Sequence, residues 1–114
     1  MREPVRDKER VRHILEAIQI IEDSRLKYAG EECTSDPIVY YGFVKHVEII
    51  GEAVYMLSKE LKAAHSEIEW TAIEGMRHVL VHGYYQIRPE QLWATIDYDI
   101  PILKSAIENL LSEL

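Results

Sequence analysis

The chain has 114 residues, of which 47% are hydrophobic and 29% are charged, and its formal net charge is -7. This length predicts a single domain over residues 1–114, and the acidic balance argues against broad, sequence-independent binding to a nucleic-acid backbone without excluding a small basic site. No apolar run approaches the ~18 residues that span a bilayer, the first residues are charged and Cys33 is the single cysteine, so we expect a cytoplasmic protein that does not associate with membranes.

A long helix is predicted at the start of the chain, from about Val5 to Tyr28, because apolar side chains recur on one face at helical spacing. These side chains are Val11, Ile14, Leu15, Ile18, Ile21 and Leu26. The basic residues near its start alternate with acids, and we interpret them as a solvated helix face. The polar run 31–35 should end this helix. Asp36 followed by Pro37 predicts the next start, since an N-cap acceptor then precedes a proline at the first helical position.

The second helix is expected from about Pro37 to Lys62, again with one apolar stripe. Its members are Tyr40, Phe43, Val44, Val47, Ile50, Val54, Leu57 and Leu61. Gly51 lies inside this helix, where a glycine costs up to about 1 kcal/mol relative to alanine. Close approach of another helix, from this chain or from a second subunit, would explain a glycine at that position.

The second half of the chain predicts a shorter helix and an interrupted last one. Residues 62–67 form a connector, which Ile68 and Trp70 should dock onto the core. The third helix is expected from about Trp70 to His82. Pro89 then opens the last helix, which Pro101 must kink or split near Asp99. Its apolar positions are Leu92, Trp93, Ile96, Ile100, Leu103, Ile107, Leu110 and Leu111. With no strand pattern in the sequence, we predict an all-α, up-and-down bundle of four to five helices.

The stretch from Arg77 to Tyr85 places an arginine, two histidines and two tyrosines around Val-Leu-Val and ends its helix at Gly83. An arginine beside a histidine suits phosphodiester cleavage, because imidazole moves a proton near neutral pH and guanidinium stabilises charge on phosphate. Arg77 and His82 lie about 140° apart on an ideal helix, so His82 must turn back at Gly83 to reach Arg77. Spacing alone leaves open that Arg77 pairs with a carboxylate and His82 is a cation at a helix C-terminus.

Metal and thiol chemistry have weaker support. His78 and His82 share a helix face and could hold zinc, but Glu74 is the sole candidate for a third ligand, so we predict no metal and no cofactor. His78 is otherwise interpreted as a partly exposed residue bonded to a neighbouring helix. No histidine lies three residues after a glutamate, as di-iron bundles require. Cys33 is expected in an acidic loop, whose charges suppress the reactive thiolate, so we interpret it as incidental.

The same stretch resembles the motif of the HEPN superfamily, and specifically its HepT-like branch. That motif is an arginine, four residues, a histidine, one residue and a tyrosine, which Arg77, His82 and Tyr84 meet. Four flanking segments also resemble this branch, and the resemblance extends from about residue 7 to residue 111. The flanking segments are 50–53 with 57–58, 70–77, 92–93 and 99–103.

The resemblance implies a helical bundle that dimerises, brings two Arg/His motifs into one cleft and acts as a metal-independent ribonuclease with toxic effect. Arg77 and His82 would be the catalytic pair. The resemblance also implies a partner, a small MntA-like nucleotidyltransferase antitoxin that neutralises the toxin by adenylylating the motif tyrosine, here Tyr84. A non-catalytic helical module that binds a nucleotide, or such a nucleotidyltransferase, is the alternative.

Two positions depart from the pattern of this branch. His78 stands where a small polar residue is common, and Arg88 lies where many members carry an acid. Arg88 would make the rim of the site more positive, which suits RNA. His78 could add a second proton carrier or a phosphate contact, or have no role, and we group both residues as auxiliary contacts to the RNA substrate.

Overall fold

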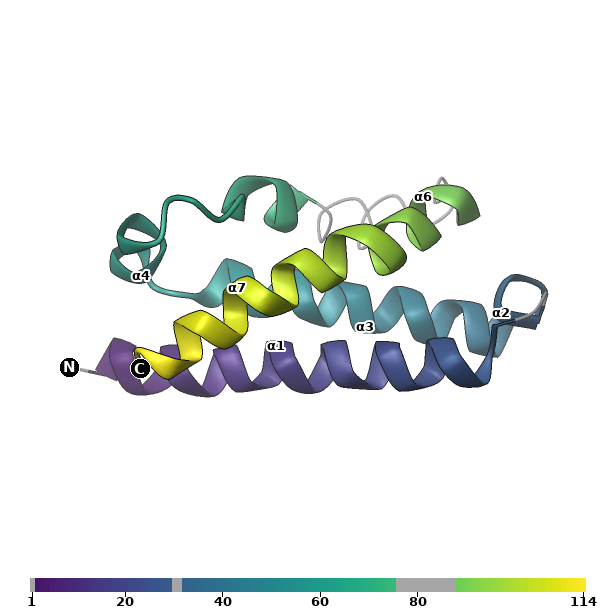
Figure 1. The fold of residues 1–114 in the computed structure, drawn as a ribbon, viewed down its shortest axis with the longest axis horizontal. Coiled ribbons are helices and arrows are strands. Elements are labelled where there is room, and N and C mark those ends of the chain that lie inside the picture. The colour runs from purple at the N-terminus through teal and green to yellow at the C-terminus, as the bar shows by residue number, and fades with distance from the viewer. Residues whose placement is uncertain (1, 30–31, 76–87) are drawn as a thin grey trace.

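The computed structural model describes residues 2–29, 32–75 and 88–114, and every regular element in these ranges is helical. The predicted all-α bundle is therefore confirmed. In Figure 1 the long helices of residues 2–27 and 37–56 lie antiparallel along the base, the segment 89–112 rises obliquely across them, and residues 59–75 lie above. The elements are α1 (Arg2–Lys27), α2 (Glu32–Ser35), α3 (Pro37–Met56), α4 (Lys59–Ala64), a helical stretch at 70–75, α6 (Pro89–Ala94), the π-helix η2 (Thr95–Asp99) and α7 (Ile100–Ser112).

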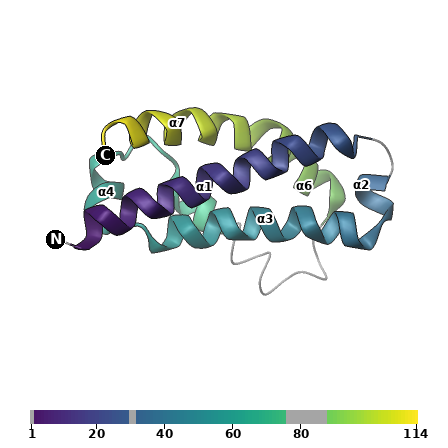
Figure 2. The same ribbon diagram turned by 90° about the horizontal axis from the view of Figure 1, so that it is seen from below.

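The core forms around α1, which lies between α3 and α7 and contacts both (Figure 2). The predicted stripes of these three helices meet there, and burial of each such side chain contributes about 1.5–3 kcal/mol. The most deeply buried members are Val11, Ile14, Ile18, Ile21, Val47, Ile50, Val54, Ile100, Ile107 and Leu110. Leu26 is predicted to be among them but is 84% exposed. It lies five residues after Ile21, which turns it about 140° away from the stripe.

The apolar stripes cover helix surfaces against one another, and they do not form a membrane-spanning element. Within the described ranges, no helix combines the length and the apolar character needed to cross a bilayer.

The predicted single helix from Pro37 to Lys62 is wrong, because α3 ends at Met56 and a new helix begins after Ser58. Asp7 of α1 stabilises this break. Its carboxylate accepts hydrogen bonds from the Ser58 backbone N–H at 2.9 Å and from the Ser58 hydroxyl at 2.6 Å. Asp7 is only 3% exposed, so it is not part of the solvated face predicted for this region. A buried carboxylate needs such donors, and they cannot be supplied by a continuous helix whose N–H groups are already bonded.

The turn between α1 and α3 contains a short helix, α2, where the polar run was expected to be irregular. The start of α3 follows the prediction. The Asp36 carboxylate accepts from the backbone N–H of Ile38 at 2.9 Å and of Val39 at 3.4 Å, and Pro37 occupies the first turn. An acceptor at the N-cap satisfies N–H groups that have no partner inside the helix.

The last helix is interrupted at the predicted place, and the interruption is a π-helical segment rather than a gap. The ribbon runs without a break from α6 through η2 into α7 (Figure 1). The Ile100 N–H bonds to the carbonyl of Thr95, five residues back, which is the spacing of a π-helix. Pro101 has no N–H to offer and lies in the first turn of α7, where one is not required.

Tyr40 is a buried residue whose hydroxyl has no hydrogen-bond partner among the described residues. Burial raises the pKa of Tyr40 above its ordinary value of 10.0, and Tyr41 and Glu90 raise it further. The folded state therefore keeps this proton at a pH where the unfolded chain loses it. Stability from this group is complete below about pH 10 and falls as the pH rises above that value.

Replacing Tyr40 with phenylalanine is expected to leave the free energy of unfolding unchanged or raise it by up to about 1 kcal/mol at neutral pH, because an unpaired buried hydroxyl is removed. The variant should also lose less stability than the wild type between neutral pH and about pH 10.5. Urea denaturation at both pH values measures this, with Tyr98→Phe, at a residue 72% exposed, as the control. A loss of more than about 1 kcal/mol at neutral pH would contradict the prediction.

Candidate functional site

Most of the residues predicted to carry chemistry lie in one stretch of the chain. Arg77, His78, His82 and Tyr84 fall outside the described residues. Arg88 is described, is exposed and immediately precedes α6. Its backbone caps that helix while its side chain makes no capping bond. The structure therefore shows how the chain is held before and after the candidate segment, which is the stretch from Arg77 to Tyr85.

On the entry side, the predicted docking of Ile68 and Trp70 onto the core is confirmed. Ile68 is partly buried against it, and Trp70 is buried at the start of the helical stretch 70–75. The Trp70 indole N–H donates to the carbonyl oxygen of Lys62 at 3.1 Å and of His65 at 3.0 Å. These carbonyls belong to the end of α4 and the turn after it, where helical partners run out. The tryptophan thus fixes the stretch 70–75 to the end of α4.

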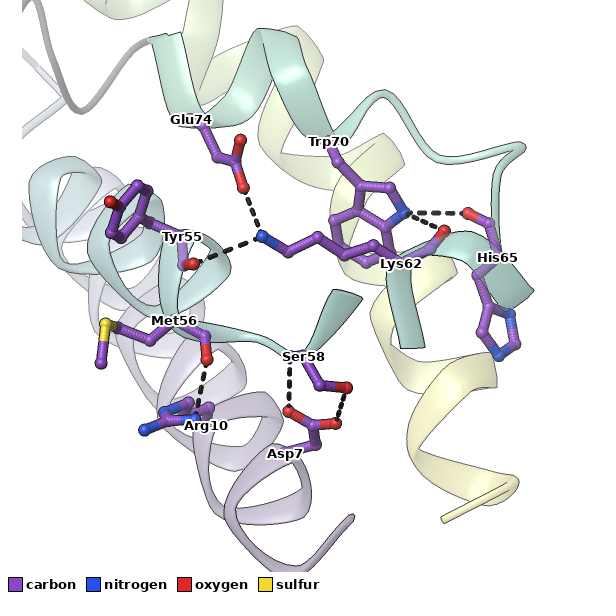
Figure 3. A network of polar contacts seen from close by, with 9 residues as sticks. All are labelled: Asp7, Arg10, Tyr55, Met56, Ser58, Lys62, His65, Trp70 and Glu74. Atoms are coloured by element: carbon purple, nitrogen blue, oxygen red, sulfur yellow. Dashed lines mark hydrogen bonds and ion pairs between the residues drawn. The ribbon is translucent and has the colours of Figure 1, made fainter. Parts of the chain in front are cut away.

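The Lys62 side chain links the end of α3 to the same stretch. Its ammonium donates to the Tyr55 carbonyl at 3.3 Å and forms an ion pair with Glu74 (Figure 3). Arg10 of α1 donates to the neighbouring Met56 carbonyl at 2.7 Å. The last turn of α3 has no basic residue of its own. Two cations from other helices therefore satisfy its terminal carbonyls and face the negative end of its dipole.

On the exit side, Trp93 anchors α6. Its ring lies edge-on to Phe43, with centroids 5.0 Å apart, and its indole N–H donates to the Thr34 hydroxyl at 2.9 Å. The Arg25 guanidinium carbon is 4.4 Å from the centroid of the same ring, within the range of a cation–π contact. The helix that follows the candidate segment is consequently held by α1, α2 and α3.

Arg25 also joins the π-helix to α2. Its guanidinium donates to both carboxylate oxygens of Asp97, at 3.0 and 2.9 Å, and to the Cys33 sulfur at 3.4 Å. The Asp97 hydrogen bond raises the pKa of Arg25 above its ordinary value. Cys33 is 6% exposed within α2, so the expected acidic loop around it is wrong. Its contact to a guanidinium eight residues earlier depends on the turn between α1 and α2, which the polar run did not reveal.

The part of the chain that the structure describes offers little support for a metal site. No group of three or more histidine, cysteine, aspartate or glutamate side chains within it is placed to hold a metal ion. Glu74, the candidate third zinc ligand, has its carboxylate paired with Lys62. An ammonium bound to a carboxylate competes with a metal for the same oxygen atoms.

Of the surface grooves lined by described residues, two lie beside α1 and beside η2–α7, and neither provides a cationic path for RNA. One encloses about 470 Å³ between α1 and α3, where Arg10 bonds to a backbone carbonyl and Lys45 pairs with Glu48 at 3.2 Å. The other encloses about 530 Å³ between residues 67–73 and the η2–α7 segment. Its lining is mainly apolar but includes the acidic residues Glu67, Glu69 and Asp99, whose charges repel phosphate. The candidate RNA chemistry therefore rests on the stretch from Arg77 to Arg88.

Lys62 and Asp7 are the site-supporting residues that sequence reasoning missed. Ser58, followed two residues later by Glu60, is a helix-start signal that would have predicted the α3–α4 break and separated Lys62 from α3. Asp7 gave no such signal, because it lies within a mixed run of acids and bases.

Comparison with known proteins identifies a family whose model matches most of this chain. Residues 14–110 match the family described as Ribonuclease HepT-like. A candidate RNase of Caldanaerobacter subterraneus subsp. tengcongensis is 35% identical over 101 residues, which cover 89% of this chain and 90% of that protein. A candidate ribonuclease HepT of Thermococcus cleftensis is 34% identical over 103 residues, which cover 90% of this chain and 94% of that protein. No solved structure gives a significant match.

Proposed function

Because this chain belongs to the HepT-like ribonuclease family, we propose that it is a metal-independent ribonuclease and the toxin of a toxin–antitoxin pair. The family match over residues 14–110 carries this proposal, since it includes both flanking anchors and the Arg77–Tyr84 motif between them. The resemblance of that motif to the HepT-like branch supports the finer parts of the proposal, namely the catalytic pair, the dimer and the antitoxin.

In the proposed reaction, His82 takes the proton from a ribose 2′-hydroxyl of the RNA. The 2′-oxygen forms a bond to the adjacent phosphorus while the bond from phosphorus to the 5′-oxygen breaks, and the protonated His82 returns the proton to the leaving 5′-oxygen. Arg77 donates two hydrogen bonds to the phosphate oxygens on which charge develops. The products are a 2′,3′-cyclic phosphate and a 5′-hydroxyl. His78 and Arg88 add positive charge at the rim.

We assign the site to a homodimer, in which two Arg/His motifs face one cleft. Large exposed apolar side chains on α1 and α3 support a partner surface, because a partner would cover apolar area that is otherwise in contact with water. They are Ile20, Ile38, Tyr41, Tyr55 and Met56. A monomeric mass at micromolar concentration, measured by sedimentation, would count against this composite site.

Purified protein is expected to cleave total RNA in the presence of a chelator and to leave single-stranded DNA intact, because DNA has no 2′-hydroxyl to attack the phosphate. The RNA fragments should carry 2′,3′-cyclic phosphates, which are identified by mass spectrometry. RNA binding without cleavage would favour the alternative, a helical module that binds a nucleotide or a nucleotidyltransferase partner. Cleavage that the chelator abolishes would contradict the metal-independent mechanism.

A further inference from the structure

Lys62 of α4 makes polar contacts with two other parts of the chain, the end of α3 and the stretch 70–75. Its ammonium reaches the last turn of α3 through the Tyr55 carbonyl and the stretch 70–75 through Glu74. Its own carbonyl accepts the Trp70 indole N–H. Figure 3 shows the lysine side chain lying between the end of α3 and the Glu74 side chain, with Trp70 close to its backbone.

The two contacts on the stretch 70–75 fix its orientation as well as its place. Trp70 and Glu74 are four residues apart, so they lie on one helix face. Both are held through Lys62, one by its backbone and the other by its side chain. A helix attached at two points one turn apart cannot rotate about its own axis without breaking one of them. The face of this stretch that meets α3 and α4 is therefore set by its two contacts with Lys62, together with the His65 carbonyl that shares the Trp70 N–H.

This orientation matters because Glu74 precedes Arg77 by only three residues. The sequence predicts that the same helix continues through Arg77, and in such a helix the rotation of residues 70–75 would decide where the guanidinium points. A displacement of about 1 Å at a reacting group can cost about a hundredfold in rate. Catalytic groups accordingly depend on neighbours that lock them in place.

We propose that Lys62 is a positioning residue for RNA cleavage. It holds the stretch 70–75, which leads to the Arg77–Tyr84 motif, against α3 and α4, so that Arg77 is aligned with the scissile phosphate. This inference rests on the proposed ribonuclease function. Lys62 touches neither substrate nor reacting atoms, and it acts through Glu74 and Trp70.

A second ion pair offers a matched control. Lys104 of α7 donates to Glu22 of α1 at 2.8 Å. The side chains of this pair are 30% and 33% exposed, against 19% and 28% for Lys62 and Glu74. Both pairs join separate helices, but only the Lys62 pair involves the stretch that leads to the motif. Substitution of either lysine should therefore have a similar effect on stability and a different effect on catalysis.

The test compares Lys62→Met, Lys62→Arg and Lys104→Met in the full-length protein. Lys62→Met is expected to lower kcat by about tenfold or more while KM stays within about twofold, because alignment is lost and substrate binding is kept. Lys62→Arg, which retains the cation, should recover most of kcat. Lys104→Met should leave kcat at the wild-type value. Hydrogen exchange of peptides covering residues 70–75 should be faster in Lys62→Met only.

Equal kcat values in Lys62→Met and Lys104→Met would overturn the proposal even if the protein is a ribonuclease. Failure of the proposed function looks different, because the wild type and Arg77→Ala would then show the same RNA cleavage. In that case the exchange measurement decides: unchanged protection of residues 70–75 in Lys62→Met overturns the anchoring role, and a specific loss supports it. If Lys62→Met does not fold, Glu74→Gln removes the same ion pair with less change in volume.

Discussion

Replacing Arg77 or His82 with alanine is expected to reduce the rate of RNA cleavage by at least about a hundredfold in each variant. Loss of one donor to a developing phosphate charge typically costs about 10²–10³ in kcat, and loss of a general base about 10²–10⁴. Because the two residues act on one transition state, the double variant should be little worse than the weaker single variant. Cleavage of a labelled RNA by proteins purified in parallel measures all three.

The pH dependence separates the two roles. A free imidazole titrates at about pH 6.5. Wild-type kcat/KM should therefore rise with pH through that region, and this rise should be absent in His82→Ala. Arg77→Ala should keep the rise at a lower rate. Arg12→Ala and His13→Ala, at exposed positions of α1 far from the motif in sequence, are the matched controls. Equal cleavage by the wild type and by both motif variants would show that this mechanism is wrong.

Co-expression with a minimal nucleotidyltransferase is expected to abolish RNA cleavage by the wild type and to leave Tyr84→Phe active. Adenylylation of the Tyr84 hydroxyl would put a bulky, negatively charged group where the RNA phosphate must enter, and phenylalanine has no oxygen to accept it. Intact mass spectrometry should show one added adenylyl group on the wild type and none on Tyr84→Phe. Cells that carry both genes should grow with the wild-type toxin and fail to grow with the variant.

Tyr85→Phe is the control for this experiment, because it changes the adjacent tyrosine and keeps the proposed acceptor. It should gain the same mass as the wild type and lose its activity in the same way. Neutralisation of Tyr84→Phe without any gain in mass would contradict modification at this residue and favour inhibition by binding alone.

Helices with a continuous apolar stripe could be predicted from the sequence, because the apolar residues of each stripe recur at fixed spacing within one segment. The stripes of α1 and α3 and the Asp36–Pro37 start belong to this class. The break after Met56 belongs to it only in part, since Ser58 and Glu60 are a local helix-start signal. The contact of Asp7 with Ser58 spans 51 residues and has no such local signal. The contact between Arg25 and Cys33 likewise requires the fold of the turn between α1 and α2.

The candidate site likewise has a part that could be predicted from the sequence and a part that could not. The residue types and the spacing of Arg77, His82 and Tyr84 indicate a chemistry from the sequence alone, because a motif is a local property of the chain. The support around it is not local. The sequence neighbours of Lys62 place it at a helix end, yet its function in the fold comes from Glu74 and Trp70, which reach it only after two helix breaks.

The bond between Asp7 and Ser58 has a consequence for the order of assembly and for protein engineering. A contact that closes a loop of this length loses chain entropy before it gains stability, so the junction after α3 should settle late in folding. The start of α1 lies at the same end of the molecule as α4 and the end of α7 (Figure 1). A truncation that removes Asp7, or a fusion that strains the first turns of α1, would release the junction from which Lys62 reaches the stretch 70–75.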